Sequence, residues 1–129
     1  MAIERTFTLP SENDIIPIDL DKSKGAKYDA DKPPMALLDP HFLTGIATVL
    51  GFGVKKYAAH NWRSGIEYSR LISAAYRHLG SILDGEDIDE ESGLPHAHHL
   101  GCTIMFLASM METRPDLDDR WKGDRNDIQ

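Results

Sequence analysis

Residues 69–111 read S-R-L-I-S-A-A-Y-R-H-L-G-S-I-L-D-G-E-D-I-D-E-E-S-G-L-P-H-A-H-H-L-G-C-T-I-M-F-L-A-S-M-M, which is two helical patterns separated by an acidic segment. The first helix is expected to begin near Ser69 and to end before Gly85, a natural helix stop. The second is expected to begin after Pro95. The positions predicted to face the core are Leu71, Ile72, Ala75, Leu79, Ile82 and Leu83 in the first helix, and Leu100, Thr103, Ile104, Leu107 and Met111 in the second.

A further helix is predicted upstream, starting at Asp39-Pro40, because an aspartate cap followed by proline is typical of a helix start. Gly51 and Gly53 are expected to weaken this helix or to end it near there. Strand signals are weak, so the fold class predicted is all-α, a small helical bundle. We expect an irregular N-terminal arm over residues 1–26, a helical domain over 27–112 and a charged C-terminal tail over 113–129.

Composition limits what the chain can do. At 129 residues it is expected to be one domain, and its net charge of −7 argues against polymeric nucleic acid or an anionic membrane as partner. The lone cysteine, Cys102, allows no internal disulfide and lies in an apolar helix, which favours a core thiol and a reducing, cytoplasmic location. We expect no signal peptide and no membrane span, and a homo-oligomer (a dimer or tetramer) is plausible for so small a core.

Imidazoles and carboxylates gather where the two helices of residues 69–111 meet. His78 near the end of the first helix is expected to face His96 and His99 near the start of the second, while His98 points to the opposite side. The acids of the connecting segment are Asp84, Glu86, Asp87, Asp89, Glu90 and Glu91. Such donors suit a divalent metal. The alternative is a solvated loop whose acids complement the next helix dipole.

Two upstream segments carry groups suited to a phosphorylated ligand. Residues 52–62, F-G-V-K-K-Y-A-A-H-N-W, combine lysines with aromatic rings and an amide, and residues 27–40 add more lysines. Arg70 and Arg77 lie seven residues apart, on one face of the predicted helix, and are able to point at one anion. The alternative is that the aromatic rings anchor the core and the lysines are solvated.

Four blocks in order resemble a known family. They are K-Y-D-A-D-K-P, F-G-V-K-K-Y-A-A-H-N-W, Y-S-R-L-I-S-A-A-Y-R-H-L and G-E-D-I-D-E-E-S-G-L-P-H-A-H-H, which begin at residues 27, 52, 68 and 85. Together they are similar to the N-terminal domain of dATP/dGTP diphosphohydrolases, found largely in bacteriophages. That family is related in character to the all-α MazG-like nucleoside triphosphate pyrophosphohydrolases, including the phage MazZ enzymes that act on dGTP.

The resemblance implies hydrolysis of a purine (deoxy)nucleoside triphosphate, dGTP/GTP or dATP, to the monophosphate and pyrophosphate, which adjusts the nucleotide pool in the host cytoplasm. MazG-like enzymes bind Mg²⁺ or Mn²⁺ through an E-x-x-E helix followed by an E-x-x-D helix, and neither motif is present here. His99-Leu100-Gly101-Cys102 is similar to the E-L-G-D of the second helix with both acids replaced. The resemblance then implies that the metal ligands have moved to imidazoles and loop acids.

The candidate site follows from these patterns. The predicted metal ligands are His78, Glu86, Asp89, His96 and His99, for Mg²⁺ or Mn²⁺ with Zn²⁺ or Fe²⁺ as further options. The candidates for the general base are Glu86 and Glu91. The phosphate contacts predicted are Lys32, Lys56, Arg70 and Arg77, and the base contacts are Tyr57, Asn61 and Trp62. Alternative functions are another metal phosphohydrolase, such as a dNTP triphosphohydrolase, a nucleotide-binding regulatory module without turnover, or an interaction protein.

Overall fold

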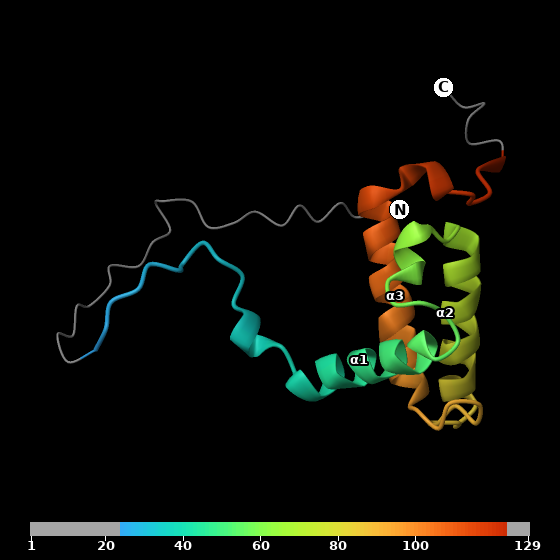
Figure 1. Cartoon of the computed structure of the whole chain (residues 1–129), viewed down its shortest axis with the longest axis horizontal. Helices are drawn as coiled ribbons and strands as arrows, with labels where there is room; N and C mark the ends of the chain where they lie inside the picture. The colour runs from blue at the N-terminus through green and yellow to red at the C-terminus, as the bar shows by residue number, and fades with distance from the viewer. Residues whose placement is uncertain (1–23, 124–129) are drawn as a thin grey trace. The chain divides into compact units, whose positions relative to one another are not determined.

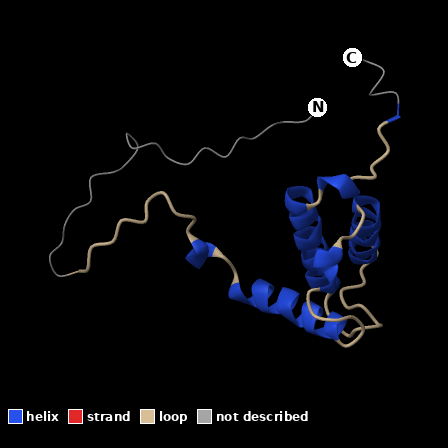
Figure 2. Cartoon of the chain, turned by 45° about the horizontal axis from the view of Figure 1, so that its top comes forward, coloured by secondary structure: helices blue, strands red, loops and turns tan. Residues whose placement is uncertain are grey.

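The structure is a computed structural model that describes residues 24–123. The part described contains the helices α1 (Pro40–Val54), α2 (Tyr68–Leu83) and α3 (His96–Thr113). Short 3-10 helices cover Met35–Leu37, Asn61–Ser64 and Pro115–Leu117. No strand occurs between residues 24 and 123, where Ile88 and Pro95 form an isolated bridge (Figure 2). The all-α prediction is therefore confirmed.

The chain divides into two units between Leu38 and Asp39. In the first unit, the amide of Lys32 donates to the carbonyl oxygen of Asp29 at 2.9 Å and closes a turn. Most of the predicted arm, residues 1–23, and the last part of the predicted tail, residues 124–129, lie outside the described residues. The proposed division into arm, domain and tail stays a prediction.

Local capping signals set the helix ends where they were expected. Asp39 accepts a hydrogen bond from the amide of His41 at 3.0 Å, and Pro40 occupies the first helical position of α1. Gly85 has a φ of +88°, a left-handed conformation that ends α2 at little cost for a residue without Cβ. Pro95 directly precedes α3. None of the described helices is both long and apolar enough to cross a membrane.

The helices α2 and α3 lie side by side, and α1 packs across α3 near the end where the acidic segment joins the other two (Figure 1). At the opposite end of the pair, Tyr68, Leu71 and Met110 form the buried core, and Trp62, Phe106 and other partly buried apolar side chains pack around it. The Tyr68 hydroxyl donates to the carbonyl oxygen of Met110 at 3.2 Å. A buried phenol needs such a partner, so this bond ties α2 to α3.

The segment after α3 folds back onto this core. Leu117 packs against the core, and the carboxylate of Asp119 accepts from the amide of Ser69 at 2.8 Å and from its hydroxyl. Asp119 thereby supplies the acceptor that the first turn of α2 lacks locally, since Glu67 makes no side-chain cap. The Ser69 hydrogen bonds hold the pKa of Asp119 below its ordinary value.

The expected core faces of α2 and α3 were partly wrong. Leu79 and Leu83 of α2 and Ile104 and Met111 of α3 are exposed, with Leu83 86% accessible. Thr103 of α3 is buried as expected, and His96, Cys102 and Met110 are buried without having been predicted. Apolar residues occur around most of the circumference of α3, so helical spacing alone does not select the buried side.

Two glycines let α1 approach α3 closely. A Cβ on Gly45 would lie 2.3 Å from Nδ1 of His98, and a Cβ on Gly101 would lie 2.5 Å from Cζ of Phe42. Each helix thus places a ring against a glycine of the other, and the rings of Phe42 and His98 meet edge to face with centroids 5.9 Å apart. His98 therefore points away from His99, as expected, and packs on α1.

Replacing Gly45 with alanine should destabilise the protein by up to about 2 kcal/mol. The new methyl group would displace the His98 ring, an overpacking cost of about 1–3 kcal/mol, which exceeds the gain of about 1 kcal/mol that alanine brings to a helix. Gly51→Ala is the matched control, because nothing lies within 4 Å of its Cβ position. That variant should be more stable than the wild type. Urea denaturation of the two variants checks the difference, and equal stabilities would contradict the close approach at Gly45.

Candidate active site

A cavity of about 1290 Å³ runs along α2 and α3 and is closed on one side by the end of α1 and the segment that follows it. The predicted site residues that line it are Lys56, Tyr57, Asn61, Trp62, Arg70, Arg77, His78, Asp89, Glu91, His96 and His99. Residues from four separate stretches of sequence therefore meet around one space. Lys32 belongs to the first unit and stays a prediction.

Three imidazoles meet at one end of this cavity. Nδ1 of His78 lies 2.9 Å from Nδ1 of His96, a hydrogen bond in which one ring donates and the other accepts. The rings of His78 and His99 are stacked nearly parallel, 9° apart with centroids separated by 4.8 Å. The expected convergence of His78 with His96 and His99 is thus present, because the connecting segment returns the chain to the end of α2.

Ser92 links a carboxylate to one of these imidazoles. Its hydroxyl donates to Oδ2 of Asp89 at 2.7 Å, and this bond holds the pKa of Asp89 below its ordinary value. Nε2 of His99 lies 2.7 Å from the same hydroxyl oxygen. Because the serine proton is engaged by an ionised carboxylate, Nε2 of His99 must carry the proton of that contact. The lone pair of neutral His99 then resides on Nδ1.

Partial burial lowers the pKa of two of the imidazoles. Desolvation is the largest cause that lowers the pKa of His78 below its ordinary value of 6.5, and the neighbouring imidazoles of His99 and His96 lower it further. Desolvation also lowers the pKa of His99, although Asp89 acts in the opposite direction. Both rings therefore favour the neutral form at neutral pH, the form that offers a lone pair to a cation or a proton.

The metal-free protein should lose stability as the pH falls below 6.5. The unfolded chain binds protons at His78 and His99 near that pH, whereas the folded chain resists them, so the free energy of unfolding is highest above this value and declines as the pH approaches the lower folded pKa values. Thermal melts in EDTA between about pH 7.5 and about pH 5.5 measure the slope. The double variant His78→Gln/His99→Gln should flatten it, and an unchanged slope in that variant would contradict the assignment.

His96 presents a buried nitrogen without a partner. The residue is 5% exposed, and its Nε2 makes no hydrogen bond while lying 3.6 Å from Oε1 of Glu86. A buried polar atom left unpaired is costly, which marks this nitrogen as a place for a further ligand. Across residues 24–123, however, no three histidine, cysteine, aspartate or glutamate side chains stand in an arrangement that holds a metal ion.

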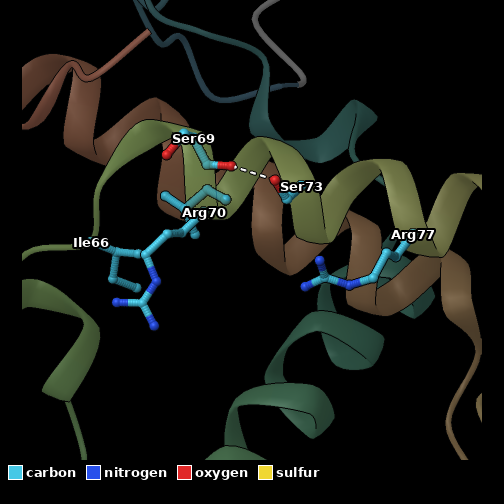
Figure 3. Close-up of a pocket in the computed structure, with 6 residues that line it drawn as sticks. Ile66, Ser69, Arg70, Ser73 and Arg77 are labelled. Carbon is cyan, nitrogen blue, oxygen red and sulfur yellow. Dashed lines mark hydrogen bonds between the residues drawn. The ribbon is translucent and has the colours of Figure 1, made fainter.

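Two arginines of α2 add positive charge beside the cavity. Arg70 and Arg77 project from the same side of the helix (Figure 3), as their spacing predicted. Both also line a smaller hollow of about 360 Å³ along α2. Neither guanidinium forms a hydrogen bond or ion pair with another described residue. They are therefore available to an anion.

The other end of the cavity is aromatic. The ring of Trp62 stacks on Phe106 with centroids 4.7 Å apart, and the guanidinium carbon of Arg63 lies 4.4 Å from the centroid of the Trp62 ring. Trp62 is thus packed against both Phe106 and Arg63. This agrees with the alternative interpretation of the aromatic rings as anchors of the core. Tyr57 is 55% exposed and remains available for stacking.

Cys102 lies in the wall of this cavity but is only 3% exposed. Burial raises the pKa of its thiol to about 11. A thiol with so high a pKa is protonated at neutral pH and is a poor nucleophile. Its raised pKa and its burial agree with the interpretation of a core thiol.

The sequence patterns missed several residues of this site. Ser92 lies in the turn-forming E-E-S-G segment, where a serine next to glycine is ordinary. Arg63 directly follows the motif that ends at Trp62, so its proximity to that tryptophan was the one available signal. Glu86 was predicted in the site, yet it lies beside His96 and does not line the cavity, whereas Glu91 does.

Comparison with known proteins adds the family. The family model described as dATP/dGTP diphosphohydrolase, N-terminal, matches residues 22–120. A protein of Salmonella phage PMBT28 named dATP/dGTP diphosphohydrolase is 40% identical over 96 residues, which make up 74% of this chain and 33% of that protein. The chain thus spans about a third of this relative's length. No solved structure matches it. The match covers nearly all the residues that the structure describes, and the chain therefore belongs to the family of the dATP/dGTP diphosphohydrolase N-terminal domain.

Proposed function

We propose that this chain hydrolyses a purine deoxynucleoside triphosphate between the α- and β-phosphates, releasing the monophosphate and pyrophosphate. The observation that carries the proposal is the polarity of the cavity, which has imidazoles and carboxylates at one end, arginines along α2 and aromatic rings at the other end. A nucleoside triphosphate has the same order of groups, with a polyanion at one end and an aromatic base at the other. The name of the phage relative supports a diphosphohydrolase.

A divalent cation, Mg²⁺ or Mn²⁺, is part of the proposal. The unpaired Nε2 of His96 and the carboxylate of Glu86 at 3.6 Å supply one nitrogen and one oxygen, and His99 and Asp89 supply further donors nearby. A site with about two protein donors suits these ions, because such ions are commonly held by one or two carboxylates together with water and substrate phosphates. When bound, the cation would neutralise charge on the phosphate oxygens.

The chain's own residues would orient the substrate and move the proton. Arg77 donates to phosphate oxygens and holds the anhydride beside the imidazoles. Glu91 lines the cavity and takes the proton of the attacking water. The water oxygen forms a bond to the α-phosphorus while the bond to the bridging oxygen breaks, and the electron pair leaves with pyrophosphate. Asn61 and Tyr57 contact the base.

Product analysis tests the proposal. The purified protein is incubated with each of the four dNTPs in Mg²⁺, Mn²⁺ or EDTA, and the products are resolved by anion-exchange chromatography. Monophosphate and pyrophosphate from a purine dNTP, formed only with metal, would support it. Nucleoside and triphosphate would instead identify a dNTP triphosphohydrolase. Binding of nucleotide without turnover in either metal would identify a regulatory module.

A further inference from the structure

The side chain of Arg63 is held in one orientation at the aromatic end of the cavity. Its guanidinium lies over the ring of Trp62, with the central carbon 4.4 Å from the ring centroid. Its Nε donates to Nδ1 of His60 at 3.0 Å. His60 itself has a φ of +61°, an uncommon conformation for a residue with a side chain. Stacking and a hydrogen bond in the guanidinium plane thus restrain an otherwise exposed side chain.

The two terminal nitrogens of Arg63 are left without protein partners. Neither makes a hydrogen bond or ion pair with a residue in the described part of the chain, and the side chain lines the cavity. A guanidinium whose Nε is already engaged has one free edge, where the two terminal nitrogens carry parallel N–H donors. Such a fork pairs best with two acceptors that lie side by side.

Position favours a base over a phosphate as the partner of this fork. Phe106, on which Trp62 stacks, lies seven residues after His99 on α3, about 10 Å along the helix axis at 1.5 Å per residue. Arg77 lies near the imidazole end, one residue before His78. Phosphates held near His99 and Arg77 would therefore leave the base at the end where Arg63 lies.

We propose that Arg63 is a specificity-determining residue that selects guanine over adenine by donating to N7 and O6 of the base; this rests on the proposed function. On its N7 edge guanine presents two adjacent acceptors, N7 and O6. On the same edge adenine presents the N7 acceptor beside the N6 amino group, a donor that does not pair with a guanidinium because the guanidinium also carries only donors. Asn61 carries both a donor and an acceptor and so serves either purine. Arg63 carries donors only, and the discrimination therefore comes from Arg63.

The test compares dGTP and dATP in the wild-type protein and in Arg63→Lys, which keeps the charge and removes the fork. The wild type should prefer dGTP. In Arg63→Lys, kcat/KM for dGTP should fall on the order of 10- to 100-fold while kcat/KM for dATP changes little, since a bidentate pair gives discrimination of that size. Arg77→Lys is the matched control and should lower both values to a similar extent. Equal loss for the two substrates in Arg63→Lys would overturn the proposal.

Base analogues locate the contact. Wild-type protein should act on dITP, which keeps O6 and N7, nearly as well as on dGTP, and more slowly on 7-deaza-dGTP, which lacks N7. In Arg63→Lys the penalty for 7-deaza-dGTP should largely disappear. A penalty of unchanged size in that variant would assign N7 to another residue and overturn the proposal.

Binding separates this inference from the proposed reaction. If no dNTP is hydrolysed, the proposed function fails, and calorimetric titration with dGMP and dAMP still examines Arg63. Tighter binding of dGMP that is lost in Arg63→Lys would support selection of guanine without turnover. Equal affinities of the wild type for dGMP and dAMP would overturn it. Circular dichroism melts check that the variant, altered at an exposed position, remains folded.

Discussion

Glu91→Gln should lower kcat for pyrophosphate release by about 10²- to 10⁴-fold, the usual contribution of a general base. Glutamine keeps the size of the side chain and most of its hydrogen bonds but does not accept the proton of water at neutral pH. Glu91 is exposed and lines the cavity, so its substitution should leave the free energy of unfolding nearly unchanged. Steady-state assays with dGTP and dATP, together with thermal melts, measure the two effects.

Glu86→Gln provides the matched comparison, because both glutamates were predicted as candidates for the base. The carboxylate of Glu86 lies beside Nε2 of His96 and outside the cavity lining. Its substitution should therefore act on metal affinity and raise the Mn²⁺ concentration that gives half-maximal rate, with a smaller effect on kcat at saturating metal. A larger loss of kcat in Glu86→Gln than in Glu91→Gln would reverse the assignment.

His99→Ala should reduce activity by about 100-fold or more, since even residues that only support metal ligands typically contribute 10- to 100-fold. The ring of His99 connects the imidazole cluster to the Asp89–Ser92 pair, because it stacks on His78 and hydrogen bonds to Ser92. Its removal would free Asp89 and Ser92 from their orientation and take away the lone pair at Nδ1. Activity assays and Mn²⁺ titration by calorimetry measure the loss.

His41→Ala is the control for this experiment, because His41 is an exposed imidazole at the start of α1. It should leave both activity and metal binding unchanged. Removing the partly buried His99 costs some packing, so circular dichroism must show that the variant is still folded under the assay conditions. A folded His99→Ala protein with wild-type activity would remove the imidazole cluster from the proposed mechanism.

Sequence patterns predicted the helix ends well because the signals there are local. Asp39-Pro40, Gly85 and Pro95 act on the backbone within one turn, through a side-chain cap, a left-handed residue or a missing amide. The buried side of α3 was harder to predict. It depends on which neighbours α1 and α2 present, and a helix that is apolar on most sides does not encode that choice.

The candidate site was likewise predictable from the sequence only in part. The meeting of His78 with His96 and His99 follows from a short connection between two helices, which places the end of one beside the start of the next. The roles of Ser92 and Arg63 do not follow from any spacing. They depend on a hydroxyl that reaches both Asp89 and His99, and on a guanidinium held between Trp62 and His60.

The amino-acid order by itself determined the three helices, their ends and the family of the chain, because caps, glycines, prolines and apolar spacing act over a few residues. Only the tertiary structure decided which glutamate faces the cavity, which nitrogen of His96 is left unpaired and which arginine stands at the aromatic end. Those properties arise from contacts between segments far apart in the chain, such as Trp62 with Phe106. Their energies depend on burial and on geometry in three dimensions, which no local pattern specifies.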